Sequence, residues 1–336
     1  MLGFIFRRLL LLIPILLGVT IVVFAAVQAI PGDAAQLMLG EKATPQALAA
    51  LRKELGLDQP LHVQYLTFLG HLLQGDLGRS VQTGNPVTWE LMGRFPATVE
   101  LALSALGIAV AVGMPLGILA AVRRNSLVDY LAMGGSLLGV SMPIFWLGLV
   151  LMMIFSAWLG WLPFSQRVDI LVTVPSVTGL MLVDTLLAGD LWAFQDAIAH
   201  LLLPAVTLST VPMAIIARMT RASMVEVLSS DYVRMARAKG LGEWAVTLKH
   251  AFKNAAIPVA TITGLQLGML LSGAILTETI FAWPGIGSLS VNAIFTRDFP
   301  VLQGCAVLFA FSFVMVNLLT DLAYTMLDPR LKPGGA

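Results

Sequence analysis

The chain has few charged residues. Asp, Glu, Lys and Arg make up 12% of its 336 residues, whereas hydrophobic residues make up 58%. Soluble globular domains usually carry about 25% charged residues. The composition therefore excludes an ordinary soluble fold and predicts an integral membrane protein. The formal net charge of +1 gives no sign of a nucleic-acid partner.

Several features typical of enzymes and of disulfide-bonded domains are also missing. The single cysteine, Cys305, lies in an apolar run, so no intrachain disulfide can form and a small buried side chain is expected. No Gly-x-x-x-x-Gly-Lys-Ser/Thr loop is present to cradle phosphates, so ATP hydrolysis is not expected on this chain. The apolar stretches offer no serine with a histidine partner, which argues against an intramembrane protease. His200 has no second ligand at metal-site spacing and is expected at a membrane interface.

Six apolar stretches are long enough to be transmembrane helices, since roughly 20 residues cross about 30 Å of hydrocarbon. Pro143 interrupts the third stretch, and Pro204 and Pro212 fall in the fourth. Membrane helices tolerate such prolines where neighbours satisfy the freed backbone groups. The predicted fold class is all-α, a polytopic membrane protein with six transmembrane helices. The predicted spans are 9–30, 98–122, 131–159, 201–219, 256–276 and 302–327.

The first stretch follows Arg7 and Arg8, as the apolar part of a signal peptide would. It is longer than an h-region of about 7 to 15 residues and lacks a clear small-residue cleavage site, so a retained first helix is expected.

Basic residues predict the orientation of the spans. Six spans place both termini on one side, together with Arg123, Arg124 and the basic loop 218–255, while the short loops of the other side hold only Arg167 and Arg297. Because short cytoplasmic loops are enriched in Lys and Arg, both termini and this loop are predicted to be cytoplasmic. The chain is therefore predicted to have two parts. Residues 1–97 form the first helix plus a periplasmic helical segment, and residues 98–336 form a core of five transmembrane helices.

The predicted periplasmic segments differ in character. Apolar positions over 45–57 and 63–73 recur at helical spacing, which favours a small helical cap. Segment 160–199 is acidic and has tryptophans near its ends. It is interpreted either as a solvated loop with interfacial tryptophans or as an acidic vestibule for a cationic group or a delivering protein. The candidate vestibule residues are Asp169, Asp184, Asp190 and Asp196.

The loop 218–255 has the pattern of two helical pieces joined by a glycine bend at 239–242. After the bend, Trp244, Ala245, Leu248 and Phe252 fall on one helical face, which predicts a short amphipathic helix. That helix could rest on the lipid surface, or it could enter a groove of a cytoplasmic protein.

The basic loop contains the motif ARAKG (236–240), with Ile257 and Pro258 after it. Further distinctive blocks are spread over nearly the whole chain: IPGD (30–33), LGLDQP (55–60), GDLG (75–78), SMPIFW (141–146), LTETIFAWPGIG (276–287) and DPR (328–330). In these blocks the sequence resembles the permease subunits of bacterial dipeptide and oligopeptide ABC importers, most closely the first dipeptide permease subunit, and ARAKG is similar to the cytoplasmic signature loop of that family.

The resemblance implies a type I ABC importer permease in the bacterial inner membrane. It implies a homologous second permease, two cytoplasmic ATPase subunits that bind ATP and Mg, and a periplasmic or lipid-anchored peptide-binding protein. No cofactor is then expected on this chain, and the cargo would be dipeptides or short peptides, with oligopeptides, glutathione, nickel complexes or haem as alternatives. An ion-coupled secondary carrier is the alternative of a different class, but the halves show no inverted repeat. The residues implied for ATPase coupling are Ala236, Arg237, Ala238, Lys239, Gly240, Leu241, Trp244 and Leu248.

Polar residues inside or beside spans are candidates for the pathway or gate, because they are costly in lipid. They are Gln266, Glu278, Asn317 and Asp321, with Glu100 near a span end. For Asn317 and Asp321, four apart on one helical face, a hydrogen bond to another helix is the alternative interpretation. Glu278 lies beside the turn at 283–285, where a re-entrant structure could help to form an outer gate.

Overall fold

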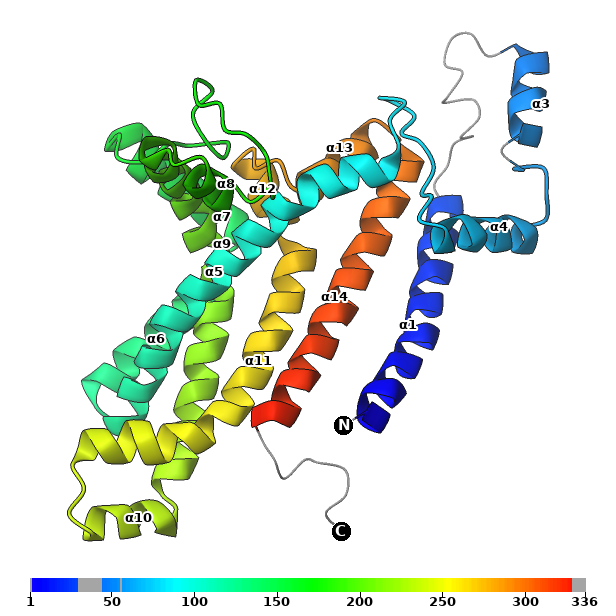
Figure 1. Cartoon of the computed structure of the whole chain (residues 1–336). Helices are drawn as coiled ribbons and strands as arrows, with labels where there is room; N and C mark the ends of the chain where they lie inside the picture. Colours follow the sequence, from blue (N-terminus) through cyan, green and yellow to red (C-terminus); the bar gives the residue numbers. More distant parts are fainter. Residues whose placement is uncertain (1, 30–43, 55, 328–336) are drawn as a thin grey trace.

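The computed structural model describes residues 2–29, 44–54 and 56–327, with side chains for 10–29, 44–50, 52–53, 56–320 and 322 (Figure 1). Every regular element in these ranges is a helix. Only one isolated bridge, between Arg79 and Pro86, pairs extended backbone within them. The predicted all-α class is confirmed.

Five described helices are long and apolar enough to cross a membrane, as a chain in lipid requires for its backbone hydrogen bonds. They are α1 (Leu2–Ala29), α5 (Val87–Val122), α9 (Leu191–Leu228), α11 (Phe252–Gly273) and α14 (Phe299–Leu327). The π-helical segment η3 (Ala245–Ala251) leads directly into α11 and forms one span with it. In Figure 1, α1 stands at one edge of the bundle, and it contacts α14.

The stretch predicted as the third span is divided at Pro143. It consists of α6 (Leu127–Ser141), α7 (Ile144–Met152) and the π-helical η2 (Met153–Trp158), and the two halves are bent by 99°. Proline disfavours helical backbone in the residue before it, and Met142 is extended with φ −84° and ψ 133°. The six predicted spans are found if this bent pair counts as one.

Short helices occupy the two ends of the bundle (Figure 1). At one end lies α10 (Asp231–Ala238), and at the other lie α12 (Ile275–Ile280) and α13 (Ile286–Phe295), with α8 (Met181–Leu187) nearby. We call these ends the α10 end and the α13 end. The two helices expected over 45–57 and 63–73 are α3 (Pro45–Glu54) and α4 (Leu61–Leu73).

Helices α5 and α9 pack closely along their length. A Cβ atom on Gly113 would lie 2.7 Å from the carbonyl oxygen of Met213, and one on Gly117 would lie 2.5 Å from that of Ala217. Small residues let membrane helices approach closely, because packing and not hydrophobic exclusion drives their association in lipid. These two glycines therefore set the spacing on which the rest of the bundle is built.

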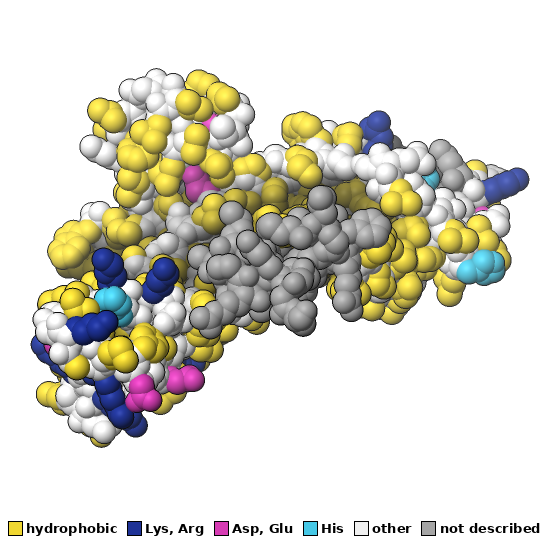
Figure 2. All heavy atoms as spheres, turned by 60° about the horizontal axis from the view of Figure 1, so that its bottom comes forward, with side chains coloured by type: hydrophobic (Ala, Val, Ile, Leu, Met, Phe, Trp, Pro, Cys, Tyr) yellow, Lys and Arg dark blue, Asp and Glu magenta, His cyan; other side chains and the backbone are white. Residues whose placement is uncertain are grey.

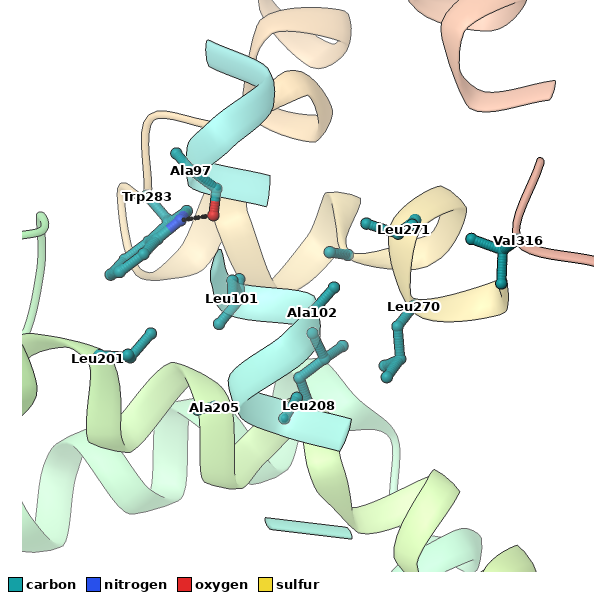
Figure 3. Close-up of a cluster of buried hydrophobic side chains, with 12 residues drawn as sticks. Ala97, Leu101, Ala102, Leu201, Ala205, Leu208, Leu270, Leu271, Trp283 and Val316 are labelled. Carbon is teal, nitrogen blue, oxygen red and sulfur yellow. Dashed lines mark hydrogen bonds between the residues drawn. The ribbon is translucent and has the colours of Figure 1, made fainter. Parts of the chain in front are cut away.

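The main core lies where α5, α9, α11 and α14 meet (Figure 3). Leu101 of α5, Leu208 of α9 and Leu270 of α11 belong to it, and Trp283, which follows α12, closes its end. The indole nitrogen of Trp283 donates a 2.8 Å hydrogen bond to the carbonyl oxygen of Ala97. A buried tryptophan needs such a partner for its N–H, so this bond fixes the loop after α12 against α5.

Candidate functional site

The first candidate site is the basic segment, residues 231–251, which comprises α10, the following bend and η3. Gly240 has a φ of +80°, a conformation that glycine adopts without steric cost, and its N–H bonds to the carbonyl oxygen of Arg237. The chain then reverses into η3, so the predicted glycine bend is present. α9 continues to Leu228, and Arg218 and Arg221 therefore belong to that helix and not to a loop.

A small apolar cluster holds the basic segment to the bundle. Val233 and Ala236 of α10, with Val246 and Ala251 of η3, are buried against the α10 ends of α5 and α9. Ala236 is only 8% exposed, so its contribution is to position the segment and not to face a partner. The segment is thereby fixed at its base.

The outer surface of the basic segment is open. Trp244 is 73% exposed, and Leu241 and Leu248 are also exposed, as are the basic residues Lys239 and Lys249. Figure 2 shows Lys and Arg side chains gathered at this end with hydrophobic side chains between them. The remaining predicted coupling residues, Arg237 and Ala238, are exposed as well.

An ion pair spans the bend of the basic segment. Arg237 at the end of α10 donates to Glu243, with Nε 2.9 Å from Oε1 and the terminal nitrogen 3.3 Å from Oε2. Both side chains are well exposed, so the pair contributes about 0 to 1 kcal/mol. It aligns the two helical pieces more than it stabilises the fold.

The second candidate site surrounds Glu278 in α12, which is fully buried. Thr98 of α5 donates its hydroxyl proton to one carboxylate oxygen at 2.7 Å, and the Ser288 N–H donates to the other at 3.0 Å. The Thr98 hydroxyl also accepts the Ile286 N–H at 2.9 Å. Glu278 lies beyond the end of the α11 span, and burial raises its pKa although these hydrogen bonds oppose the shift.

Glycines make room for the Glu278 carboxylate. A Cβ atom on Gly285 would lie 2.3 Å from Oε2 of Glu278, and one on Gly287 would lie 2.9 Å from the same oxygen. The loop between α12 and α13 can therefore wrap around the carboxylate only with glycine at these positions. The sequence singled out Glu278 as a gate candidate but did not reveal its partner Thr98.

An ion pair that the sequence did not reveal lies beside this cluster. Arg167, in the segment after η2, pairs with Glu100 of α5, and both side chains are almost buried. Arg167 also donates to the Gly179 carbonyl oxygen at 3.0 Å, and its guanidinium lies 5.5 Å from the ring centroid of Trp283. Glu100 also accepts the Leu182 N–H at 2.8 Å. This network ties the segment 160–182 to α5.

The other pathway candidates lie apart from these hydrogen bonds. Gln266 is buried in α11, Asn317 is partly buried in α14, and neither is among the hydrogen-bond partners found for Glu278. Asp321 belongs to α14, but its side chain lies outside the described residues. α11 and α14 pack against each other, and Gly264 faces Thr320 at this contact.

The four aspartates of the candidate vestibule serve local structure. Asp184 is buried, and burial would raise its pKa, but hydrogen bonds from Thr178 and Gly179 outweigh it and hold the pKa below its usual value. Asp190 caps α9 by accepting the Ala193 N–H. Asp169 and Asp196 come together, because the Asp169 N–H donates to the Asp196 carboxylate at 2.7 Å. Asp184 is thus held by local hydrogen bonds, and a vestibule formed by these aspartates stays a prediction.

Two family profiles match the chain. The profile described as binding-protein-dependent transport system inner membrane component matches residues 113–333. The chain belongs to this family. A second profile, for the N-terminal part of such membrane components, matches residues 1–102. The resemblance inferred from the sequence motifs is confirmed.

Curated relatives match this permease over almost its full length. It is 51% identical over 333 residues to the di/tripeptide transport system permease protein DppB of Pseudomonas aeruginosa (strain UCBPP-PA14), covering 99% of each chain. It is 49% identical over 336 residues to the dipeptide transport system permease protein DppB of Escherichia coli (strain K12), again covering 99% of each. The glutathione transport system permease protein GsiC of Salmonella paratyphi A (strain ATCC 9150 / SARB42) is 43% identical over 332 residues, with 99% of both chains covered.

A solved structure supports the fold. The inward-facing MetNI methionine ABC transporter aligns with a TM-score of 0.56, covering 71% of this permease and 97% of that chain at 15% sequence identity. At this identity the likeness concerns the fold alone. Together the family and the fold make the chain a multi-pass membrane permease of an ABC importer, which works with partner subunits.

Proposed function

We propose that this permease forms, with a homologous second permease, the pathway by which dipeptides or short peptides cross the inner membrane. The relatives named for dipeptide and di/tripeptide transport, at 49% and 51% identity, support this cargo. Two cytoplasmic ATPase subunits hold ATP and Mg and supply the energy, and a periplasmic or lipid-anchored binding protein delivers the peptide. Both termini and the basic segment lie in the cytoplasm.

The observation that carries this proposal is the direct helical connection from the basic segment through α11, which one residue joins to the helix of Glu278. η3 leads without a break into α11, and only Ala274 separates α11 from α12, which contains Glu278. A displacement of the basic segment therefore moves the axis of α11 and shifts α12 against Thr98 of α5. Rigid helices that move as units are the usual carriers of such transitions.

The exposed face of the basic segment fits an ATPase groove. Trp244 and Leu248 are exposed among the residues that the structure describes, and Lys239 and Lys249 flank them. A helix that presents apolar anchors at short spacing is a common way to fill a groove on a partner protein. Large exposed aromatic side chains also contribute strongly to binding where a partner encloses them.

The cluster around Glu278 is suited to act as a gate at the α13 end. Its hydrogen bonds join α12, α5 and the start of α13 through one carboxylate. Breaking one of them leaves a buried carboxyl group without a partner, so the cluster has one well-satisfied closed arrangement and an unfavourable partly broken one. A two-state element of this kind responds to a shift in α11 by switching and not by gradual deformation.

Uptake of labelled dipeptides, tripeptides and glutathione, in cells expressing the permease with its partner subunits, tests the proposal. We expect Trp244→Ala and Gly240→Asp to abolish peptide uptake while the protein still inserts in the membrane. Trp192→Ala is the matched control, because Trp192 is 62% exposed but lies in α9 near the α13 end. This control is expected to transport at the wild-type rate.

The outcomes separate the parts of the proposal. Unchanged uptake by Trp244→Ala and Gly240→Asp would reject the basic segment as the coupling site. Uptake by this chain without any ATPase would instead favour an ion-coupled carrier. Transport of glutathione but of no di- or tripeptide would contradict the cargo while leaving the coupling mechanism intact.

A further inference from the structure

Helix α4 has an unusual composition for a helix outside the bundle. Its sequence, from Leu61 to Leu73, contains no Lys, Arg, Asp or Glu, and none of its residues is buried in the protein. Leu61, Leu66 and Leu73 are 61%, 62% and 81% exposed. In water, so much exposed leucine on one short helix would mark an interaction surface.

α4 packs against the membrane-spanning part of α1. Phe24 of α1 contacts the rings of Tyr65 and Phe68, with centroids 5.6 and 6.1 Å apart. The Tyr65 hydroxyl lies 3.0 Å from the Thr20 hydroxyl, which is only 5% exposed. The side chains of Gln28 and Gln64 also form a 2.9 Å hydrogen bond.

These contacts fix the depth of α4. The apolar span of α1 covers Leu10–Ala29, so Thr20 lies about 15 Å along the helix from Leu10, well inside this apolar stretch. Phe24 lies about 7 Å before Ala29 by the same measure. Figure 1 shows α4 beside the part of α1 that lies nearest the α13 end, running across α1 and not along it. A helix that meets α1 at these residues lies within the membrane thickness and not above it.

The two sides of α4 differ as expected for this position. Gln64, Thr67 and His71 recur at spacings of three and four residues and form a polar side. Leu66, Leu69 and Leu73 recur in the same way on the opposite side, where His62 in the first turn is the polar exception. Charged residues occur only beyond the ends of the helix, at Asp58 and Asp76.

We infer that α4 is an interfacial helix that lies in the lipid leaflet at the α13 end, with its leucine side in contact with acyl chains. Lipid is the occupant that fits this side, because α4 packs against the apolar span of α1, which is itself exposed at Val22 and elsewhere along its length. The polar side then faces the headgroups. Such a helix anchors the segment between α1 and α5 to the bilayer through buried apolar area.

The test measures the surroundings of single nitroxide labels by electron paramagnetic resonance. Labels are placed on Leu66→Cys, His71→Cys and Leu171→Cys in the full chain, assembled with its partner subunits in liposomes. Leu171 lies in the segment 160–180 and is 85% exposed, so it serves as the aqueous control. Cys305 is 1% exposed, and wild-type protein treated with the label serves as the blank.

Oxygen concentrates in acyl chains and a charged nickel chelate stays in water, so the two relaxing agents distinguish the environments. We expect the label at Leu66 to be relaxed more by oxygen than by nickel, and the labels at His71 and Leu171 to be relaxed more by nickel. Nickel access at Leu66 equal to that at Leu171 would place α4 in water and overturn the inference. Protection of Leu66 from both agents would overturn it too, because a second permease or a binding protein would then cover the helix.

Discussion

Thr98 of α5 and Glu278 of α12 form a 2.7 Å hydrogen bond across 180 residues of sequence. It joins α5 to α12, and α12 follows α11 after the single residue Ala274. The same hydroxyl accepts the Ile286 N–H, so one side chain joins three elements. The following predictions test this link and its surroundings.

Replacement of Thr98 by alanine removes both hydrogen bonds and leaves a buried carboxylate with one donor fewer. We expect Thr98→Ala to lower the free energy of unfolding by about 1 to 3 kcal/mol, because an unsatisfied buried polar group is costly. Thr98→Ser keeps the hydroxyl and should stay close to wild type. Thermal unfolding in detergent measures the difference, and equal stability of Thr98→Ala and wild type would contradict the role of the bond.

Replacement of Gly285 by alanine places a methyl group against the Glu278 carboxylate. Since the new Cβ atom would lie 2.3 Å from Oε2, the loop or the carboxylate has to move. We expect Gly285→Ala to reduce both thermal stability and transport strongly. Gly93→Ala is the matched control, because nothing lies within 4 Å of its Cβ position and alanine is favoured over glycine inside a helix.

Replacement of Arg167 by glutamine leaves Glu100 buried without its counter-ion. Removing one partner of a buried ion pair typically costs about 3 to 5 kcal/mol. We therefore expect Arg167→Gln to unfold at a clearly lower temperature. The double variant Arg167→Gln with Glu100→Gln should recover much of this loss, because no unpaired charge remains; a double variant as unstable as the sum of both single variants would argue against coupling.

The raised pKa of Glu278 predicts how stability depends on pH. Because its pKa is raised in the folded state, Glu278 binds a proton more tightly in the folded protein than in the unfolded chain. The contribution is fully present below the usual pKa of 4.5 and is lost as the pH rises through the folded-state value. As the pH rises from 4.5 through the folded-state pKa of Glu278, we expect the unfolding temperature of the wild-type protein to decrease. The unfolding temperature of Glu278→Gln should change less over the same pH range. A parallel pH dependence in both proteins would assign the effect to another group.

The positions of the spans could be predicted from sequence, because a chain that crosses the lipid has to form helices with a sufficiently long apolar stretch. The sharp bend at Pro143 could be expected only as an interruption, since its angle depends on what both halves pack against. Helix α9 extends well beyond the predicted span 201–219 at both ends, because its polar ends continue the helix outside the apolar stretch.

The sites were predictable to different degrees. The glycine bend of the basic segment follows from local sequence, and so does its apolar face. The pair of Arg167 and Glu100 does not, because 67 residues separate the partners and no motif connects them. The aspartates of segment 160–199 looked like one acidic group by composition, whereas backbone N–H groups bind them individually.

The close approach of α5 and α9 has a consequence for biosynthesis. Residues 123–190 emerge from the ribosome after α5 is complete and before α9 begins, so the face of α5 with Gly113 and Gly117 is made before the helix that packs against it. Glycine leaves no bulky side chain to be rearranged there when α9 arrives. Arg167 belongs to this intervening stretch, so it can neutralise Glu100 of α5 before α9 has been made.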